Sequence, residues 1–104
     1  MKPNASIVEA VADSVTIVDH SMYQISIRIQ SSTPPEGMES LAEAGQRNLL
    51  SPQYVLDETG SLDLTNGRNL RLMKLRFAKR GDTFKAKISL APNGKWVLLD
   101  LIDH

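Results

Sequence analysis

The sequence predicts one α+β domain over residues 1–104, with one main helix packed on a curved antiparallel meander sheet. Three observations predict this fold class: a capped amphipathic segment near the middle of the chain, β-branched alternating segments on either side of it, and tight-turn letters between those segments. The 104 residues are 41% hydrophobic and 23% charged, and none is cysteine. A chain of this size buries enough surface for one core without disulfides.

The residues that precede the helix predict a hairpin. Residues 5–13 fit either a short helix behind Asn4 or an edge strand. From Val15 onward, "VTIV" and "MYQISIRIQ" are β-branched and alternating, which places Tyr23 and the isoleucines that follow it on one face. The turn letters "DHS" between the two runs predict the connection of the hairpin.

The main helix is predicted within "STPPEGMESLAEAGQRNLLSP". Thr33 fits the N-cap, Pro34 the first helical position and Glu36 the third, which together form a capping box. The apolar stripe that follows at helical spacing consists of Met38, Leu41, Ala42, Gly45 and Leu49. Pro52 ends the pattern, and the stripe is expected to cover the sheet.

The second half of the chain predicts the meander. "YVLD" and "SLDL" fit short strands, and longer strands are predicted at residues 69–79, 83–91 and 95–102. "TNGR" is typical of a type I′ hairpin turn, and "RG" and "NG" separate the longer strands.

The register set by these turns gives the meander two different faces. The expected core face comprises Met73, Leu75, Phe77, Phe84, Ala86, Ile88, Leu90, Val97, Leu99 and Leu101. The opposite face carries Lys74, Arg76, Lys85, Lys87 and Asp100 beside Leu72, Trp96, Leu98 and Ile102. Arg76 is expected opposite Lys85, and Lys74 opposite Lys87, so like charges meet across the strands. Asp100 is expected opposite Lys87, where it relieves part of the repulsion.

The order of the elements and the closing stretch "NGKWVLLDLID" resemble the cone-shaped NTF2-like fold. A cystatin-like helix on a meander is the second topology that fits. The NTF2-like resemblance implies a concave sheet with a ligand-binding or catalytic pocket, into which Tyr23 or His20 would point.

We expect a non-enzymatic binding or assembly module without a cofactor, which uses the basic and aromatic face for contact with a protein partner or for self-association. The candidate partner-binding residues are Lys74, Arg76, Lys85, Lys87, Trp96, Leu98 and Ile102. Two other interpretations stay open. In one, acidic residues of the N-terminal segment cover this face. In the other, the face binds nucleic acid through phosphate contacts, with Trp96 as a stacking platform.

The charges are divided unevenly along the chain. The first 67 residues hold three basic and nine acidic residues, whereas the remainder holds nine basic and three acidic residues. This asymmetry fits either attraction between the two halves within the fold or an interaction surface.

The sequence predicts no catalytic set and no metal site. His20 lies between turn letters, where sequence neighbours cannot form a triad, and His104 follows Asp103 at the end of the sequence. The letters "RGD" at residues 80–82 resemble the integrin-recognition tripeptide but fit a tight turn. The opening residues lack the apolar region of a signal peptide, and no apolar run approaches the ~18 residues that cross a bilayer. The compartment is not predicted, because a removed leader would leave the same sequence.

Overall fold

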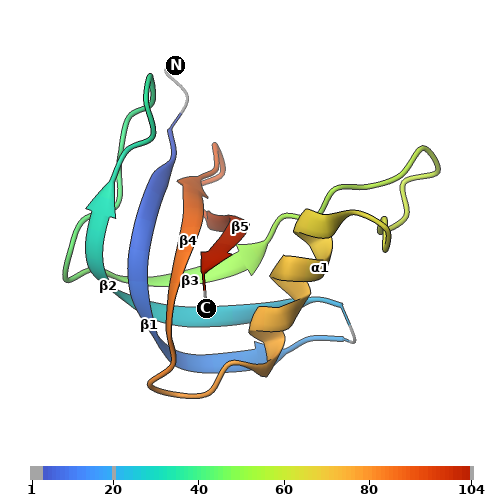
Figure 1. The fold of residues 1–104 in the computed structure, drawn as a ribbon, viewed down its shortest axis with the longest axis horizontal. Coiled ribbons are helices and arrows are strands. Elements are labelled where there is room, and N and C mark those ends of the chain that lie inside the picture. The colour runs from blue at the N-terminus through green and yellow to red at the C-terminus, as the bar shows by residue number, and fades with distance from the viewer. Residues whose placement is uncertain (1–3, 20, 104) are drawn as a thin grey trace.

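The computed structural model describes residues 4–19 and 21–103, which form a closed barrel of five strands (Figure 1). The strands are β1 (Ser6–Ile17), β2 (Tyr23–Thr33), β3 (Arg47–Pro52), β4 (Thr83–Leu90) and β5 (Trp96–Asp103). Between β3 and β4 the chain forms the helix α1 (Gly67–Lys74) and the 3-10 helix η1 (Leu75–Phe77). Around the barrel the order is β1-β2-β3-β5-β4, and β4 pairs back onto β1. The β3–β5 pair is parallel, and the other pairs are antiparallel.

The predicted hairpin is confirmed as β1 and β2. Strand β1 starts at Ser6, so residues 6–13 belong to a strand, and no helix forms behind Asn4. Tyr23 and the three isoleucines of β2 alternate into the core, as their period of two predicts. Two register shifts interrupt the pairing of β1 with β2, one at Gln30 of β2 and one at Asp13 of β1. Bulges increase the local bend and twist of a strand, which helps β1 to pair with β2 on one side and β4 on the other (Figure 1).

The prediction of a main helix at residues 33–50 is wrong. Residues 34–46 form a loop with two short turns, and residues 47–52 form β3. Of the predicted apolar stripe only Ala42 is buried, while Met38, Leu41 and Leu49 are exposed. Gly37 and Gly45 both adopt positive φ angles, which break a helix. Pairing of β3 with β2 and β5 therefore overrides the local capping signals.

The prediction of a strand at residues 69–79 is also wrong, because α1 and η1 occupy this segment. Asn66 is the N-cap of α1 and not the first residue of a hairpin turn, since its side chain accepts a hydrogen bond from the Asn69 backbone N–H at 3.2 Å. Leu72 and Leu75, three residues apart, are both fully buried. This spacing places them on one face of a helix.

Strands β4 and β5 confirm the last predicted hairpin but correct its register. Ala86 pairs with Leu101 and Lys87 with Asp100, as predicted. A register shift between Lys87 and Ile88 then pairs Ile88 with Leu98. Because a slip of one residue exchanges the two faces of a strand, Leu98 points into the core and not onto the outer face.

The core fills the interior of the barrel, as in other small barrels. Its buried side chains are Val8, Ala10, Ala12, Tyr23, Ile25, Ile27, Ile29, Ala42, Leu50, Leu72, Leu75, Phe84, Ala86, Ile88, Leu98 and Leu101. The helical pair Leu72 and Leu75 belongs to this cluster, so α1 and η1 pack against the barrel. A closed barrel with one short helix replaces the predicted α+β meander, and neither the NTF2-like nor the cystatin-like topology applies.

The segment between β3 and α1 projects away from the barrel at the upper right of Figure 1. Its residues 55–65, called the acidic arm below, contain Asp57, Glu58 and Asp63 and no basic residue. A bridge between Leu56 and Leu62 joins the two limbs of this arm.

Candidate functional site: a groove across β2, β3 and β5

The structure disperses the predicted partner-binding residues over four elements. Lys74 ends α1, Arg76 lies in η1, Lys85 and Lys87 lie on β4, and Trp96, Leu98 and Ile102 lie on β5. Leu98 is buried in the core, whereas Ile102 is about half exposed. The single basic and aromatic sheet face that the sequence predicts therefore does not form.

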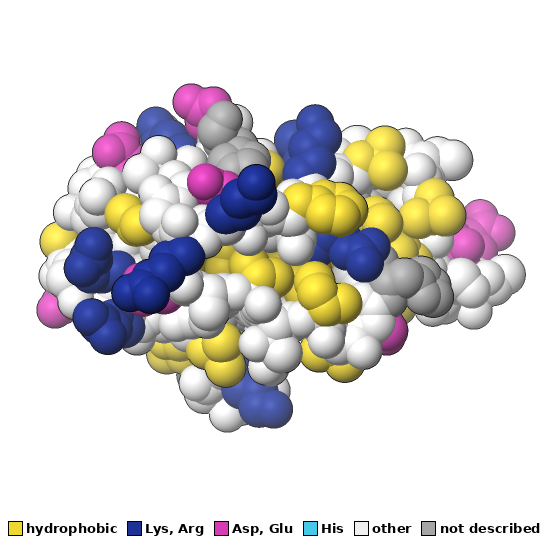
Figure 2. All heavy atoms as spheres, turned by 90° about the horizontal axis from the view of Figure 1, so that it is seen from below, with side chains coloured by type: hydrophobic (Ala, Val, Ile, Leu, Met, Phe, Trp, Pro, Cys, Tyr) yellow, Lys and Arg dark blue, Asp and Glu magenta, His cyan; other side chains and the backbone are white. Residues whose placement is uncertain are grey.

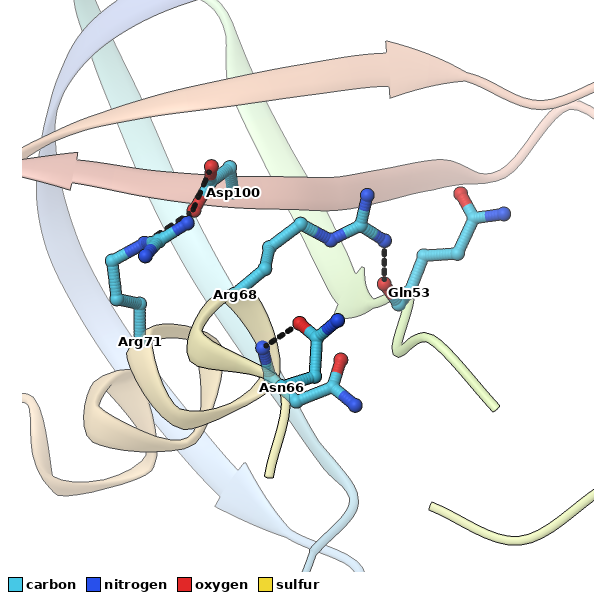
Figure 3. Close-up of polar contacts among 6 residues, drawn as sticks. Gln53, Asn66, Arg68, Arg71 and Asp100 are labelled. Carbon is cyan, nitrogen blue, oxygen red and sulfur yellow. Dashed lines mark hydrogen bonds and ion pairs between the residues drawn. The ribbon is translucent and has the colours of Figure 1, made fainter. Parts of the chain in front are cut away.

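The like-charge contacts predicted across the β-hairpin do not form, because Lys74 and Arg76 lie in α1 and η1 and not in a strand beside β4. Lys85 lies between Glu9 on β1 and Asp103 on β5 in the register of the barrel. Asp100 lies opposite Lys87, but its carboxylate accepts two hydrogen bonds from the Arg71 guanidinium at 3.0 and 3.1 Å (Figure 3). This ion pair of α1 with β5 raises the pKa of Arg71, mainly through the hydrogen bonds.

A groove of about 340 Å³ crosses the barrel wall where the start of β3 and the β4–β5 loop diverge. Its lining residues are Gln24 on β2, Arg47, Asn48, Leu49 and Ser51 on β3, Gly94 and Lys95 in the loop, and Trp96 at the start of β5. Leu49 is 54% exposed and provides apolar surface among the polar side chains of the lining. Among the described residues that line the groove there is no carboxylate.

Trp96 is held in place by Asn48, a polar residue that is buried in the barrel wall. In the amide orientation that satisfies both groups, the Trp96 indole N–H donates to the Asn48 side-chain oxygen at 3.1 Å. The Asn48 amide nitrogen donates to the Arg47 carbonyl at 3.2 Å. Because the indole also packs against the core, its position is fixed from two sides while part of it lines the groove.

One arginine that lines this groove, Arg47, lies beside a second arginine, Arg28. Arg28 on β2 and Arg47 on β3 are directly paired in the antiparallel register, and both are exposed. Residues paired in this way point to the same side of the sheet, so the two like charges destabilise the pair. Neither guanidinium forms an ion pair with a residue that the structure describes. The two guanidinium groups therefore concentrate positive charge at this position of the sheet.

A second hollow, of about 310 Å³, is lined by residues of β1, β2, β4 and β5. Its charged lining residues are Glu9, Lys85 and Asp103, so Lys85 already has two carboxylates on the neighbouring strands. This hollow lacks the uncompensated positive charge of the groove.

Only one residue of the arginine pair was placed in the correct type of element by the sequence pattern. Arg28 occupies an outward position of the alternating run "MYQISIRIQ", opposite to the face predicted for Tyr23 and the isoleucines. Arg47 was assigned to a helix, so its pairing with Arg28 could not be predicted. Trp96 was a predicted binding residue, and it lines the groove, but with partners other than the predicted lysines.

The described residues contain no group of three or more His, Asp or Glu side chains placed to hold a metal ion. His20 and His104, considered above for a pocket or a metal site, lie outside the described residues. Tyr23, the other pocket candidate, is fully buried, and its O–H donates to the Leu72 carbonyl, so it faces no open cavity. In the part of the chain that the structure describes, no helix has the length and apolar character to cross a membrane.

The strand order, the parallel β3–β5 pair and the helix between β3 and β4 give the topology of an OB-type Greek-key barrel. The fold and the groove together thus define a small β-barrel with a cationic groove on its wall. Comparisons with protein-family models, with curated proteins and with solved structures gave no match.

Proposed function

We propose that this protein is a non-enzymatic binding module that holds single-stranded nucleic acid in the groove across β2, β3 and β5. The observation that carries the proposal is the exposed pair Arg28 and Arg47, two like charges placed directly opposite each other, of which Arg47 lines a groove without carboxylates. A phosphate backbone supplies the negative charges that this pair lacks.

The remaining lining residues suit the same ligand. Arg47 to Ser51 extend over roughly 13 Å along β3, which is long enough for a strand of several nucleotides. Trp96 and Leu49 offer apolar surface to bases, while Lys95 adds a positive charge on the loop side. A basic groove combined with an aromatic side chain is the usual means of binding single strands without sequence preference.

The fold adds a supporting analogy. In OB-type barrels the face of strands 2 and 3 and the loop between strands 4 and 5 bind oligonucleotides or oligosaccharides. The groove lies over the same elements in this chain. Because one fold serves many functions, the proposal depends on the charges and side chains of the groove and not on the barrel itself.

The test uses Trp96, the only tryptophan of the chain, as a fluorescent reporter in titrations with a single-stranded oligonucleotide of about 15 nucleotides. We expect quenching on binding and an affinity that falls with salt, by a log–log slope of about −0.7 for each phosphate contacted. The double variant Arg28→Gln and Arg47→Gln should weaken binding at least tenfold and make this slope shallower by about 1.4.

The matched control is the double variant Lys85→Gln and Lys87→Gln, which removes the same charge from β4, outside the groove. It should bind almost as tightly as the unmodified chain. Equal loss of affinity in both double variants, or binding without a change in Trp96 fluorescence, would show attraction by net charge alone and refute the groove.

A further inference from the structure

The end of α1 carries a second positively charged surface, and none of its residues lines the groove. It is called the helix-end patch and consists of Lys74, Arg76, Phe77, Lys79 and Arg80. Lys74, Lys79 and Arg80 are exposed and form no ion pair with a residue that the structure describes. The segment from Arg68 to Arg80 contains no acidic residue.

An aromatic side chain lies within this patch. Phe77 is 74% exposed, and the Arg76 guanidinium lies 5.2 Å from the centre of its ring. Figure 2 views the molecule from the lower side of Figure 1, where α1 ends, and shows hydrophobic side chains gathered in the middle of that face with basic ones among them. Arginine and exposed aromatic residues are the types that dominate binding energy at protein interfaces.

The acidic arm has the complementary composition. Leu56 and Leu64 are 60% and 61% exposed, and they flank three carboxylates in a segment without basic residues. The arm is ordered by its own hydrogen bonds. The Asp57 carboxylate accepts from the backbone N–H groups of Thr59 and Ser61, and the Asp63 carboxylate from that of Thr65. The exposed leucines and the carboxylates of the acidic arm are therefore complementary to a surface that presents a phenylalanine among cations.

The arm and the patch of one chain lie at opposite ends of α1. The arm leads into the N-terminal end of the helix at Asn66, and the patch begins at its last residue, Lys74. Eight helical residues span about 12 Å, and in Figure 1 the arm extends away from the helix end that carries the patch. Within one chain, therefore, the two complementary surfaces do not meet.

We infer that two copies of this chain associate through these surfaces, the acidic arm of each copy docking on the helix-end patch of the other. Such reciprocal contact closes a two-fold dimer, in which each complementary pair of surfaces occurs twice. Leu56 and Leu64 contact Phe77 of the second copy, and the arm carboxylates pair with Lys74, Lys79 and Arg80. The nucleic-acid groove takes no part in this contact, so each proposal stands or fails independently of the other.

The experiment is sedimentation velocity of the full chain over a concentration series, combined with charge reversal. The unmodified chain should move toward twice its 11.5 kDa mass as concentration rises, and high salt should shift it back to the monomer. The patch variant carries Lys74→Glu, Lys79→Glu and Arg80→Glu, and the arm variant carries Glu58→Lys, Ser61→Lys and Asp63→Asn. Each variant alone should remain a monomer.

Mixing the two variants is the decisive step. The patch variant then offers an acidic arm to the unaltered patch of the arm variant, and the reversed surfaces attract each other as well, so the mixture should dimerise. A monomeric unmodified chain at the highest concentration, a dimer in either variant alone, or a mixture that stays monomeric overturns the proposal.

The control variant Arg28→Glu, Arg47→Glu and Lys95→Glu has the same change in net charge as the patch variant but alters only the groove. It should still dimerise. Phe77→Ser, at an exposed position, should weaken the dimer while the melting temperature of the monomer stays unchanged. Loss of the dimer in the groove variant, or no effect of Phe77→Ser, contradicts the assigned surface.

Discussion

Tyr23 connects the first hairpin to the helix inside the barrel. Its ring is fully buried, and its O–H donates to the carbonyl of Leu72 on α1. That carbonyl also accepts the backbone N–H of Leu75, so it keeps one partner if the phenol is removed. Burial, together with the nearby Tyr54, raises the pKa of Tyr23 well above its ordinary value of 10.0. The folded chain therefore holds this phenol in its neutral form.

This pKa predicts a loss of stability in alkaline solution. The unfolded chain releases the Tyr23 proton near pH 10 and the folded chain does not, so the contribution of this group is complete below pH ~10 and declines above it. The slope for Tyr23 is at most about 1.4 kcal/mol per pH unit. Tyr23→Phe should cost about 1 kcal/mol at neutral pH but give a flatter curve above pH ~10. Urea unfolding at several pH values measures both effects.

Tyr54→Phe serves as the comparison. The pKa of Tyr54 is also raised, mainly by burial, but this side chain is only partly buried. Its removal should flatten the alkaline decline less than Tyr23→Phe does. Equal slopes in the unmodified chain and in Tyr23→Phe would contradict the assigned role.

The outer face predicted for β5 does not form as expected, for reasons that concern single residues. The pattern of β5 alone predicts that Trp96, Leu98 and Ile102 share an outer face. The bulge beside Lys87 moves Leu98 to the core, and a buried asparagine 48 residues earlier in the sequence fixes the indole of Trp96. Neither a bulge nor a hydrogen bond between distant segments leaves a signal in the local alternation of a strand.

At the scale of elements, α1 and the acidic arm depend on one buried side chain. Asn69 is fully buried, and its side chain makes three hydrogen bonds to the arm backbone. It accepts from the Val55 N–H at 2.8 Å, and it donates to the carbonyls of Val55 and Asp63 at 2.8 and 2.9 Å. The base of the arm is thus attached to the first turn of α1.

Asn69→Ala should therefore lower the free energy of unfolding by about 2–3 kcal/mol, because three backbone groups lose their partner. It should also make the arm sensitive to limited proteolysis. Asn66→Ala is the matched control, since it removes the cap of the same helix and should cost about 1 kcal/mol without releasing the arm. The prediction fails if the two variants lose equal stability and the arm stays resistant in both.

Elements were predicted correctly where their partners are adjacent in sequence. The hairpins β1–β2 and β4–β5 have short connections, and their alternation agrees with the observed burial. The two errors, residues 33–50 and 69–79, concern segments that pair or pack with distant parts of the chain. Capping letters favoured a helix in the first segment, but the strand pairs of β3 outweigh this weak local preference.

At the scale of the whole molecule, the barrel closes through a single short parallel pair. Strand β3 meets β5 only at Leu50–Trp96, Ser51–Val97 and Pro52–Leu98, whereas β1 and β2 pair along their whole length. Pro52 has no backbone N–H, and parallel pairing is slightly weaker per residue than antiparallel pairing. Ser51 and Trp96 of this pair line the groove. The proposed binding site therefore borders the weakest part of the barrel wall.

Amide hydrogen exchange measured by NMR tests this arrangement. In the free protein, the β3–β5 amides should exchange at least tenfold faster than those of Ile25 and Ile27, which corresponds to an opening free energy lower by about 1.4 kcal/mol. A single-stranded oligonucleotide in the groove should slow exchange at Ser51 and Val97 and leave the β1–β4 amides unchanged, because a ligand protects the structure that it contacts. Uniform protection around the free barrel would show that the closure is not a weak point. Protection by the oligonucleotide at β1–β4 alone would place the ligand over the second hollow, where Lys85 lies between two carboxylates.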